Sequence, residues 1–255
     1  MAKMTGHFVG ISTPRRMIGD FLQASRHIPT IVIHRRMNLA ALVEARESSL
    51  PRPSWCAIFT KAFASVTAEH AELRRVYVSL PWPRFYEWDA NHFSIVIERD
   101  YLGESALFLA RIRSPETRQL GEIDALIQDF KCRPVEEIAG FRSAIRLAKM
   151  PRLVRILAWS LLMNWLPRAR GKQIGTHGIS VTAGMGATAL NLITPWPFAL
   201  NYDVFSPDGS LDVRMTFDHR VADAAFLARA LQEMEQKLLG PIRNEVLSTH
   251  RRSAA

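Results

Sequence analysis

A histidine and an aspartate four residues apart are the residues of this sequence that most directly suggest chemistry. Both lie in the segment MTFDHRVADA, residues 215–224. Residues 213–217 alternate apolar and polar side chains as a half-buried strand does, and apolar side chains recur at helical spacing over residues 224–239. His219 is therefore expected on a strand-to-helix connection, where an imidazole can exchange a proton near neutral pH. A loop histidine held only by a hydrogen bond is the alternative.

The stretch from Met215 to Leu239 also resembles the closing motif of the acyltransferase component of 2-oxoacid dehydrogenase complexes, and the similar motif of chloramphenicol acetyltransferases. In both families the histidine is followed by three residues, an aspartate and usually a glycine. Further segments resemble the same catalytic domain in the same order: residues 14–19, 24–29, 30–33, 39–46, 54–73, 93–97, 106–112, 119–131, 175–180 and 193–197. The resemblance spans nearly the whole chain. It implies one catalytic domain over residues 1–255 with an α/β (α+β) fold, a mixed β-sheet flanked by helices, assembled as a homotrimer.

The resemblance implies coenzyme A-dependent acyl transfer with the active sites between subunits. His219 would be the general base, removing the proton of a thiol or hydroxyl that attacks the thioester in a ternary complex, without a covalent acyl-enzyme. Ser180 matches the family's hydroxyl donor, which stabilises the oxyanion and reaches the histidine across a subunit boundary. Thr182 is a second hydroxyl close by. The alternative for Ser180 is a strand serine bonded to its own backbone.

Asp223 has two possible roles. It would orient the imidazole directly, as the acid of a triad does, or, as the resemblance to the acetyltransferases implies, pair with an arginine near the N-terminus and brace the site. Arg15 and Arg16 are the candidate partners, Arg15 being the better match. Alternatively, both arginines are solvated on an exposed helix face. Asp218 is assigned only local turn geometry.

Three departures from the family pattern favour a different class of function, a non-catalytic trimeric scaffold. Ala224 replaces the usual glycine, and residues 181–186 are a looser version of the family's loop. The sequence carries no lipoyl or subunit-binding domain before the catalytic region, so no covalently bound lipoyl group is expected on this chain. As an enzyme it would use acyl-coenzyme A with a lipoylated carrier protein or a small hydroxyl compound as acceptor. Whether trimers form a larger multimer is left open.

Composition limits the remaining possibilities. With 255 residues, 48% hydrophobic and 22% charged, the chain is expected to be a soluble globular protein of one domain. Cys56 and Cys132 have no metal-ligand spacing and no secretory signal before them, which favours reduced thiols in the cytoplasm. No His, Cys and Asp cluster suggests a metal. The net charge of +9 comes from dispersed basic residues without a nucleic-acid motif, so coenzyme A phosphates or an anionic membrane are the expected attractants.

A basic and apolar segment at residues 142–172 is predicted as a helical insertion. Its centre, residues 153–166, is too short for the roughly 20 residues of a membrane-spanning helix and contains Arg155. Burial within the domain or packing on a neighbouring subunit is the expected role. Peripheral membrane contact is the alternative, because aromatic residues with basic flanks also suit an interfacial helix.

Overall fold

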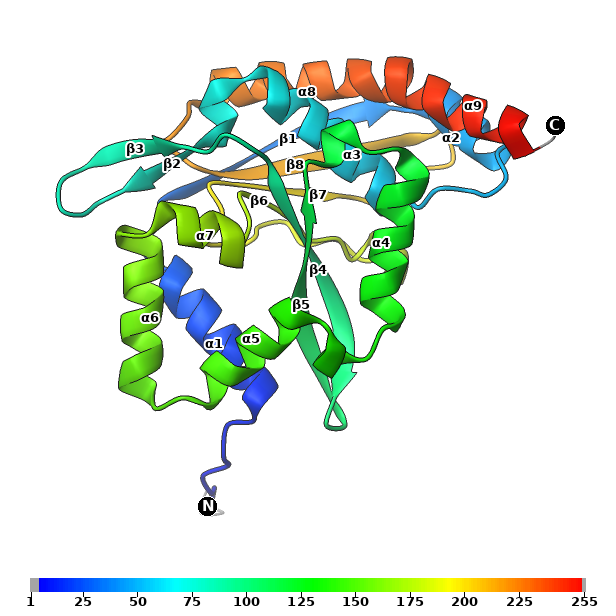
Figure 1. Ribbon diagram of the computed structural model, residues 1–255. Helices are drawn as coiled ribbons and strands as arrows, with labels where there is room; N and C mark the ends of the chain where they lie inside the picture. Colours follow the sequence, from blue (N-terminus) through cyan, green and yellow to red (C-terminus); the bar gives the residue numbers. More distant parts are fainter. Residues whose placement is uncertain (1–4, 254–255) are drawn as a thin grey trace, which may run out of the picture.

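A six-stranded mixed sheet runs through the molecule, a computed structural model that describes residues 5–253, with side chains described as far as Ser248. The strand order is β1-β8-β7-β6-β4-β5, and the pairs β4–β6 and β6–β7 are parallel whereas the other pairs are antiparallel (Figure 1). The strands are β1 (Thr30–Asn38), β4 (His92–Tyr101), β5 (Glu104–Arg113), β6 (His177–Ile179), β7 (Phe198–Tyr202) and β8 (Ser210–Asp218). A separate hairpin pairs β2 (Arg75–Val78) with β3 (Arg84–Glu87). The mixed sheet expected from the resemblance is therefore present.

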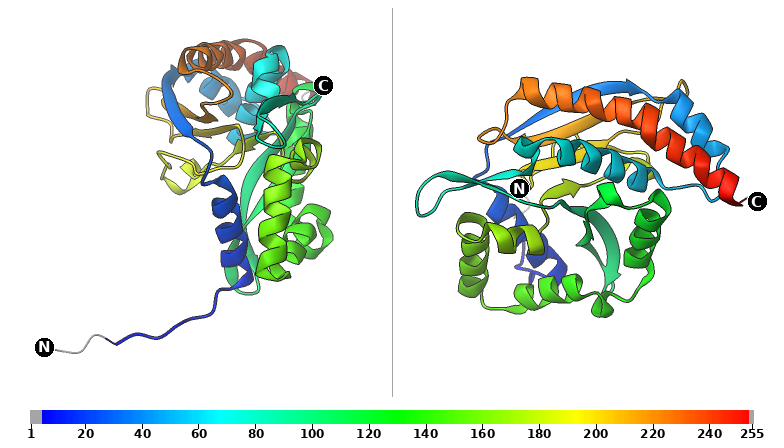
Figure 2. Two further views of the ribbon diagram at one scale, coloured as in Figure 1. Left: turned by 90° about the vertical axis from the view of Figure 1, so that its left-hand side faces the viewer. Right: turned by 45° about the horizontal axis from the view of Figure 1, so that its top comes forward.

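The main core lies between one face of this sheet and a layer of helices. That layer contains α2 (Ala40–Glu47), α3 (Trp55–Glu69), α4 (Leu120–Cys132), α8 (Ala224–Lys237) and α9 (Arg243–Ser253) (Figure 2). Side chains from β4 and β7 alternate between the two faces, so that Ile95, Ile97 and Leu200 enter the main core. Val96 and Ala199 enter a second, smaller cluster on the other face.

Four further helices, α1 (Thr13–Ser25), α5 (Ala139–Lys149), α6 (Arg152–Asn164) and α7 (Pro167–Gln173), lie below the rest of the sheet in Figure 1. Side chains of α1 and α6 pack into the second cluster, whereas Phe141 and Ile145 of α5 belong to the main core. Local sequence explains where two of the helices of the fold begin. The Ser12 hydroxyl accepts a hydrogen bond from the backbone N–H of Arg15 at the start of α1, and Ser54 does the same for Ala57 at the start of α3.

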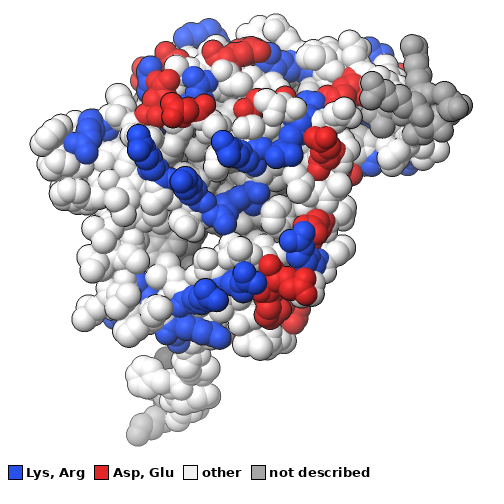
Figure 3. Space-filling view, in the orientation of Figure 1, with Lys and Arg blue, Asp and Glu red and all other residues white. Residues whose placement is uncertain are grey.

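The segment predicted as a helical insertion contains all of α6 and most of α5 and α7. Trp159 and Leu162 of α6 pack onto the second cluster. The outer face of α6 is open to solvent, with Leu153 81%, Leu157 59% and Trp165 47% exposed. The expectation that this helix is buried within the domain is therefore wrong for its outer face, because a helix at the edge of the molecule packs on one side only. Packing of that face on a neighbouring subunit stays a prediction. Figure 3 shows a row of Lys and Arg over α5 beside this largely uncharged face.

The two cysteines differ in environment. Cys132 is exposed at the end of α4, whereas Cys56 is partly covered in α3 and desolvation raises the pKa of its thiol to about 11. Within residues 5–253 no helix is long and apolar enough to cross a membrane. The same residues contain no group of three or more His, Cys, Asp or Glu side chains arranged to hold a metal ion.

Candidate active site

His219 lies on the turn between β8 and α8, as the sequence predicts. Its backbone N–H donates to the carbonyl oxygen of Pro29 at 3.0 Å, so the turn before β1 contacts the turn after β8. The backbone N–H of Val221 donates to the carbonyl of Asp218 at 2.9 Å and closes the turn. Residues 24–29 and 215–239, two of the segments that resemble the acyltransferase domain, are thus neighbours in space.

The imidazole of His219 is held at one of its two nitrogens. Nδ1 lies 3.0 Å from the carbonyl oxygen of Ala222, an acceptor only, so Nδ1 carries the proton and donates it. Nε2 then has the free lone pair, and it has no hydrogen-bond partner among the described residues. The side chain is 44% exposed. A general base requires such an arrangement, in which one ring nitrogen is held and the other is left to accept a proton.

Asp223 does not hydrogen-bond to the imidazole within the chain. Its Oδ1 is 4.0 Å from Nδ1 of His219, too far for a hydrogen bond, and its side chain is 88% exposed. The Ala222 carbonyl therefore orients the ring. Asp223 precedes the first residue of α8, Ala224, which has helical geometry, so the methyl group that replaces the family's glycine hydrogen is accommodated without strain.

Asp218 does more than the local turn role expected for it. Its carboxylate is buried and accepts two hydrogen bonds from the guanidinium of Arg220, at 2.9 and 2.8 Å. The same guanidinium lies 4.2 Å from the ring centre of Tyr77 in β2. This pair fixes the residues on both sides of His219 to the hairpin.

Arg170 is a site residue that the sequence analysis missed. It is 4% exposed in α7 and donates to the carbonyl oxygens of Met163 and Pro195, the first at 3.3 Å. Burial lowers the pKa of its guanidinium to about 10, while the charge of Asp218 acts in the opposite direction. Arg170 remains charged at neutral pH and joins α6 to the loop before β7. Its sequence position among the basic residues around an apolar helix gave no signal of burial.

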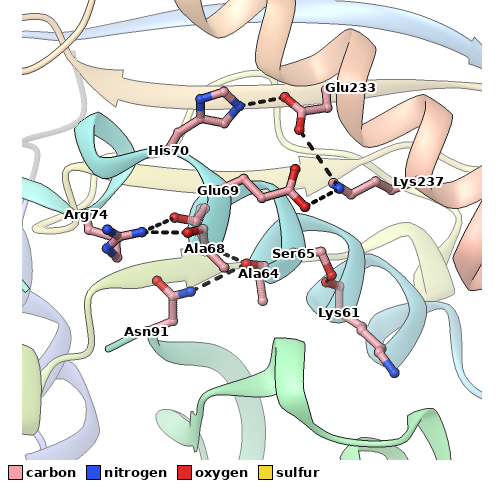
Figure 4. Close-up of polar contacts among 11 residues, drawn as sticks. Lys61, Ala64, Ser65, Ala68, Glu69, His70, Arg74, Asn91, Glu233 and Lys237 are labelled. Carbon is pink, nitrogen blue, oxygen red and sulfur yellow. Dashed lines mark hydrogen bonds and ion pairs between the residues drawn. The ribbon is translucent and has the colours of Figure 1, made fainter. Parts of the chain in front are cut away.

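Ion pairs attach α8 to α3 behind the turn (Figure 4). His70 contacts Glu233 at 2.6 Å, and Lys237 contacts Glu69 at 2.7 Å. The hydrogen bond from Lys237, with further help from Glu233, lowers the pKa of Glu69. These contacts hold α8, the helix that follows Asp223, in a fixed position relative to α3.

Ser180 follows β6, where its backbone N–H donates to the carbonyl of Leu200 at 3.1 Å. Its hydroxyl has no partner among the described residues. The hydroxyl of Thr182, the second candidate, donates to the carbonyl of Ala187 at 2.7 Å and holds the following loop. His177 is buried and stacks on Phe93 with ring centres 4.6 Å apart, which makes it a core residue.

Ser180 and His219 are not brought together within one chain. In the strand register, Ile179 is paired with Leu200 and Phe217 with Phe198, so Ser180 is beside position 201 whereas His219 continues the strand past position 197. An offset of about five strand residues corresponds to roughly 16 Å along the sheet. A site that uses both residues needs a second copy of the chain.

Arg15 and Arg16 are likewise away from Asp223 in the single chain. Arg15 pairs with Glu104 of β5 at 3.2 Å, and Arg16 donates to the carbonyl oxygens of Ala148 and Ile11. The reason is the direction of α1: Arg15 is in its first turn, whereas the turn that contacts His219 follows its last, on the order of 15 Å away. The predicted pair between Arg15 and Asp223 is therefore not made within one chain.

No family model and no curated protein matches this sequence. Three solved structures with similar folds cover most of it. A truncated catalytic core of the 2-oxoacid dehydrogenase multienzyme complex from Thermoplasma acidophilum is 15% identical, covers 92% of this chain and 99% of its own, and has a TM-score of 0.67. The dihydrolipoamide acetyltransferase of Azotobacter vinelandii is 17% identical over 95% of both chains, with a TM-score of 0.63. A chloramphenicol acetyltransferase is 14% identical over 87% of this chain and 94% of its own, with a TM-score of 0.52.

These similarities confirm the expected fold: the chain has the fold of acetyltransferase catalytic cores and of chloramphenicol acetyltransferase. The Azotobacter enzyme was studied for the role of a serine, a histidine and an asparagine in its catalytic mechanism, the asparagine lying four residues after the histidine. In the present chain the residue four positions after His219 is Asp223.

Proposed function

We propose that the chain is a coenzyme A-dependent acyltransferase in which His219 is the general base. The observation that supports this best is the hydrogen bond from Nδ1 of His219 to the Ala222 carbonyl, which makes Nε2 the proton acceptor of the neutral ring in a side chain that is 44% exposed. It occurs on the fold of known acetyltransferases, at the turn where the sequence motif resembles theirs.

In the proposed reaction Nε2 of His219 takes the proton from the thiol or hydroxyl of the acceptor. The acceptor's sulfur or oxygen attacks the thioester carbonyl of acyl-coenzyme A, giving a tetrahedral oxyanion. When the carbon–sulfur bond breaks, the imidazolium returns the proton to the departing coenzyme A thiolate. Acyl group, proton and electron pairs are then balanced, and no other reactant is needed. The acceptor is either a lipoyl thiol on a carrier protein or a hydroxyl group.

The oxyanion donor in this proposal is Ser180 of a neighbouring chain in a homotrimer. The free hydroxyl of Ser180 and its separation from His219 within the chain support a site between subunits. Asp223, with 88% of its side chain exposed, would then be available to an arginine of another copy, Arg15 being the candidate. Assembly of trimers into larger particles and a cytoplasmic location belong to the same proposal.

The experiment is thiol release from a panel of acyl-coenzyme A thioesters, with dihydrolipoamide and with simple alcohols as acceptors. We expect His219→Ala to lower the rate about 100-fold to 10,000-fold, the usual contribution of a general base. Ser180→Ala should lower it about 100-fold through loss of an oxyanion donor. His34→Ala is the matched control, because His34 is an exposed histidine on β1. It should keep the wild-type rate.

Equal background rates for wild type and His219→Ala with every acceptor would contradict the enzyme proposal. That outcome would favour the alternative, a trimeric scaffold that has kept the fold without turnover. The long exposed loop after Ser180, which departs from the family pattern, is the observation that favours this alternative.

A further inference from the structure

A cavity of about 450 Å³ lies between α1, α5 and α6 and the β4–β5 part of the sheet. It is lined by large apolar side chains from five separate segments, among them Phe21, Leu109, Leu147, Trp159, Leu162 and Trp196. Its volume is within the range of roughly 300–1,000 Å³ that small-molecule sites occupy. Figures 1 and 2 show the helices that contribute to its wall, α1 in blue and α5 and α6 in green.

Two charged side chains line the cavity, Asp20 and Arg111, and each is bonded to other protein groups. Asp20 and Arg155 form an ion pair at 2.7 Å, with side chains 18% and 11% exposed. The guanidinium of Arg111 donates to the backbone oxygens of Lys172 and Gln173. Backbone oxygens do not neutralise the Arg111 guanidinium, but Asp20 is paired and the rest of the wall is mostly apolar, so an ionic group placed deep in the cavity would lose its hydration. An uncharged hydrocarbon group is the ligand that this wall accepts.

One hydroxyl in the wall is unpaired, and it belongs to Ser180. Ser180 is the proposed oxyanion donor, so the cavity extends from the place where the acyl carbonyl would react. A hydrocarbon chain that fills the cavity would have its reactive end at this hydroxyl. The outer wall on the other side is α5 and α6, the segment that the sequence analysis identified as an insertion.

We propose that this cavity holds the hydrocarbon chain of the substrate, and that the substrate class is a long-chain lipid. The hydrocarbon chain belongs either to the acyl group of the donor or to an alcohol that serves as acceptor. Both have a long, uncharged aliphatic group. This inference rests on the proposed function for the reaction, but binding of the hydrocarbon chain does not depend on catalysis.

Binding is tested first, with a nitroxide-labelled stearic acid that quenches the fluorescence of Trp159 and Trp196 in the cavity wall. Unlabelled n-alkanols of increasing length are then used as competitors. Affinity should rise about fourfold per added methylene until the cavity is full. Trp159→Phe should reduce the quenched fraction of the emission, which locates the probe.

Two substitutions fill the cavity from two different helices of its wall. Ala144→Phe on α5 and Ala158→Phe on α6 each place a ring in the space, and each should weaken binding of long alkanols at least tenfold. Ala139→Phe adds the same ring on the exposed side of α5 and is the matched control. Thermal melting followed by circular dichroism identifies a variant that fails to fold. The other of the two cavity-filling variants then provides the test.

Turnover measurements show whether the hydrocarbon chain in the cavity belongs to the acyl donor or to the alcohol acceptor. The rate is measured over a chain-length series of acyl-coenzyme A with a short alcohol, and over an alkanol series with acetyl-coenzyme A. Ala144→Phe should shorten the optimum in one series only, which identifies the donor or the acceptor as the occupant. Affinity that is independent of chain length, or equal effects of Ala144→Phe and Ala139→Phe, would overturn the inference.

The inference and the proposed function fail in different ways. Chain-length-dependent binding without turnover would support the cavity assignment and contradict the enzyme proposal. Turnover of short acyl groups by a His219-dependent reaction, without any chain-length effect, would do the reverse.

Discussion

The two best-defined histidines of the molecule illustrate how environment assigns roles to one residue type. His219 is partly exposed, with one nitrogen fixed by a carbonyl and the other free. His177 has both ring nitrogens in contact with protein atoms, Nε2 at 2.9 Å from the Leu73 carbonyl and Nδ1 at 2.8 Å from the Thr176 hydroxyl. Burial lowers the pKa of His177 to about 3, so this ring is neutral in the folded protein and serves packing.

The lowered pKa of His177 predicts acid sensitivity of the fold. In the unfolded chain a histidine titrates near about 6.5, so between that value and about 3 the unfolded state binds more protons than the folded state. The stability contribution is therefore complete above about pH 6.5 and is lost as the pH falls below it, by up to about 1.4 kcal/mol per pH unit. Urea unfolding of the wild type at pH 7, 6 and 5 should show this slope.

His177→Gln should reduce the slope, although it lowers stability at pH 7 through lost packing. His92, whose pKa is also lowered by burial and by nearby Arg113, contributes with the same sign, so part of the slope should remain. His34→Gln, an exposed change, should leave the slope unaltered. Identical slopes in wild type and His177→Gln would show that His177 is not the responsible group.

At the scale of elements, the sequence predicts those parts whose pattern is local. The strand before His219 is β8, the helix after it is α8, and the expected central strands are β4 and β5. The hairpin β2–β3 was not anticipated, because residues 81–83, with two prolines, indicate only its turn. The roles of Arg170 and of the cavity were also missed, since both arise from contacts between segments far apart in the sequence.

Arg170 predicts how α6, α7 and the loop before β7 depend on one another. Arg170→Met keeps an unbranched apolar stem but removes the guanidinium, which leaves the carbonyls of Met163 and Pro195 without their donor. At about 1–3 kcal/mol for each of the two buried carbonyls left unsatisfied, the free energy of unfolding should fall by roughly 2–6 kcal/mol. Denaturant unfolding measures this. Arg168→Met, an exposed change two residues earlier in α7, should alter the free energy of unfolding little. An equal loss of stability in both variants would argue against a specific role for Arg170.

At the scale of the whole molecule, the separation of Ser180 from His219 predicts complementation between chains. His219→Ala and Ser180→Ala chains, each nearly inactive alone, are unfolded together and refolded as a mixture. In a ring where each site takes His219 from one chain and Ser180 from the next, about one site in four receives both intact residues. Activity should recover to about a quarter of the wild-type value. If the mixed chains assemble but activity does not recover, His219 and Ser180 of different chains do not form a shared active site.

The exposed thiol at the end of α4 offers a way to observe such an assembly in solution. Near neutral pH Cys56 stays protonated, because the pKa of its thiol is raised to about 11, and nucleophilic attack on a maleimide requires the thiolate. Cys132 is the other of the two cysteines and is accessible. A nitroxide attached there gives each chain one paramagnetic centre without any mutation. A threefold ring would then show three coupled spins at a single distance, whereas a twofold pair would show two.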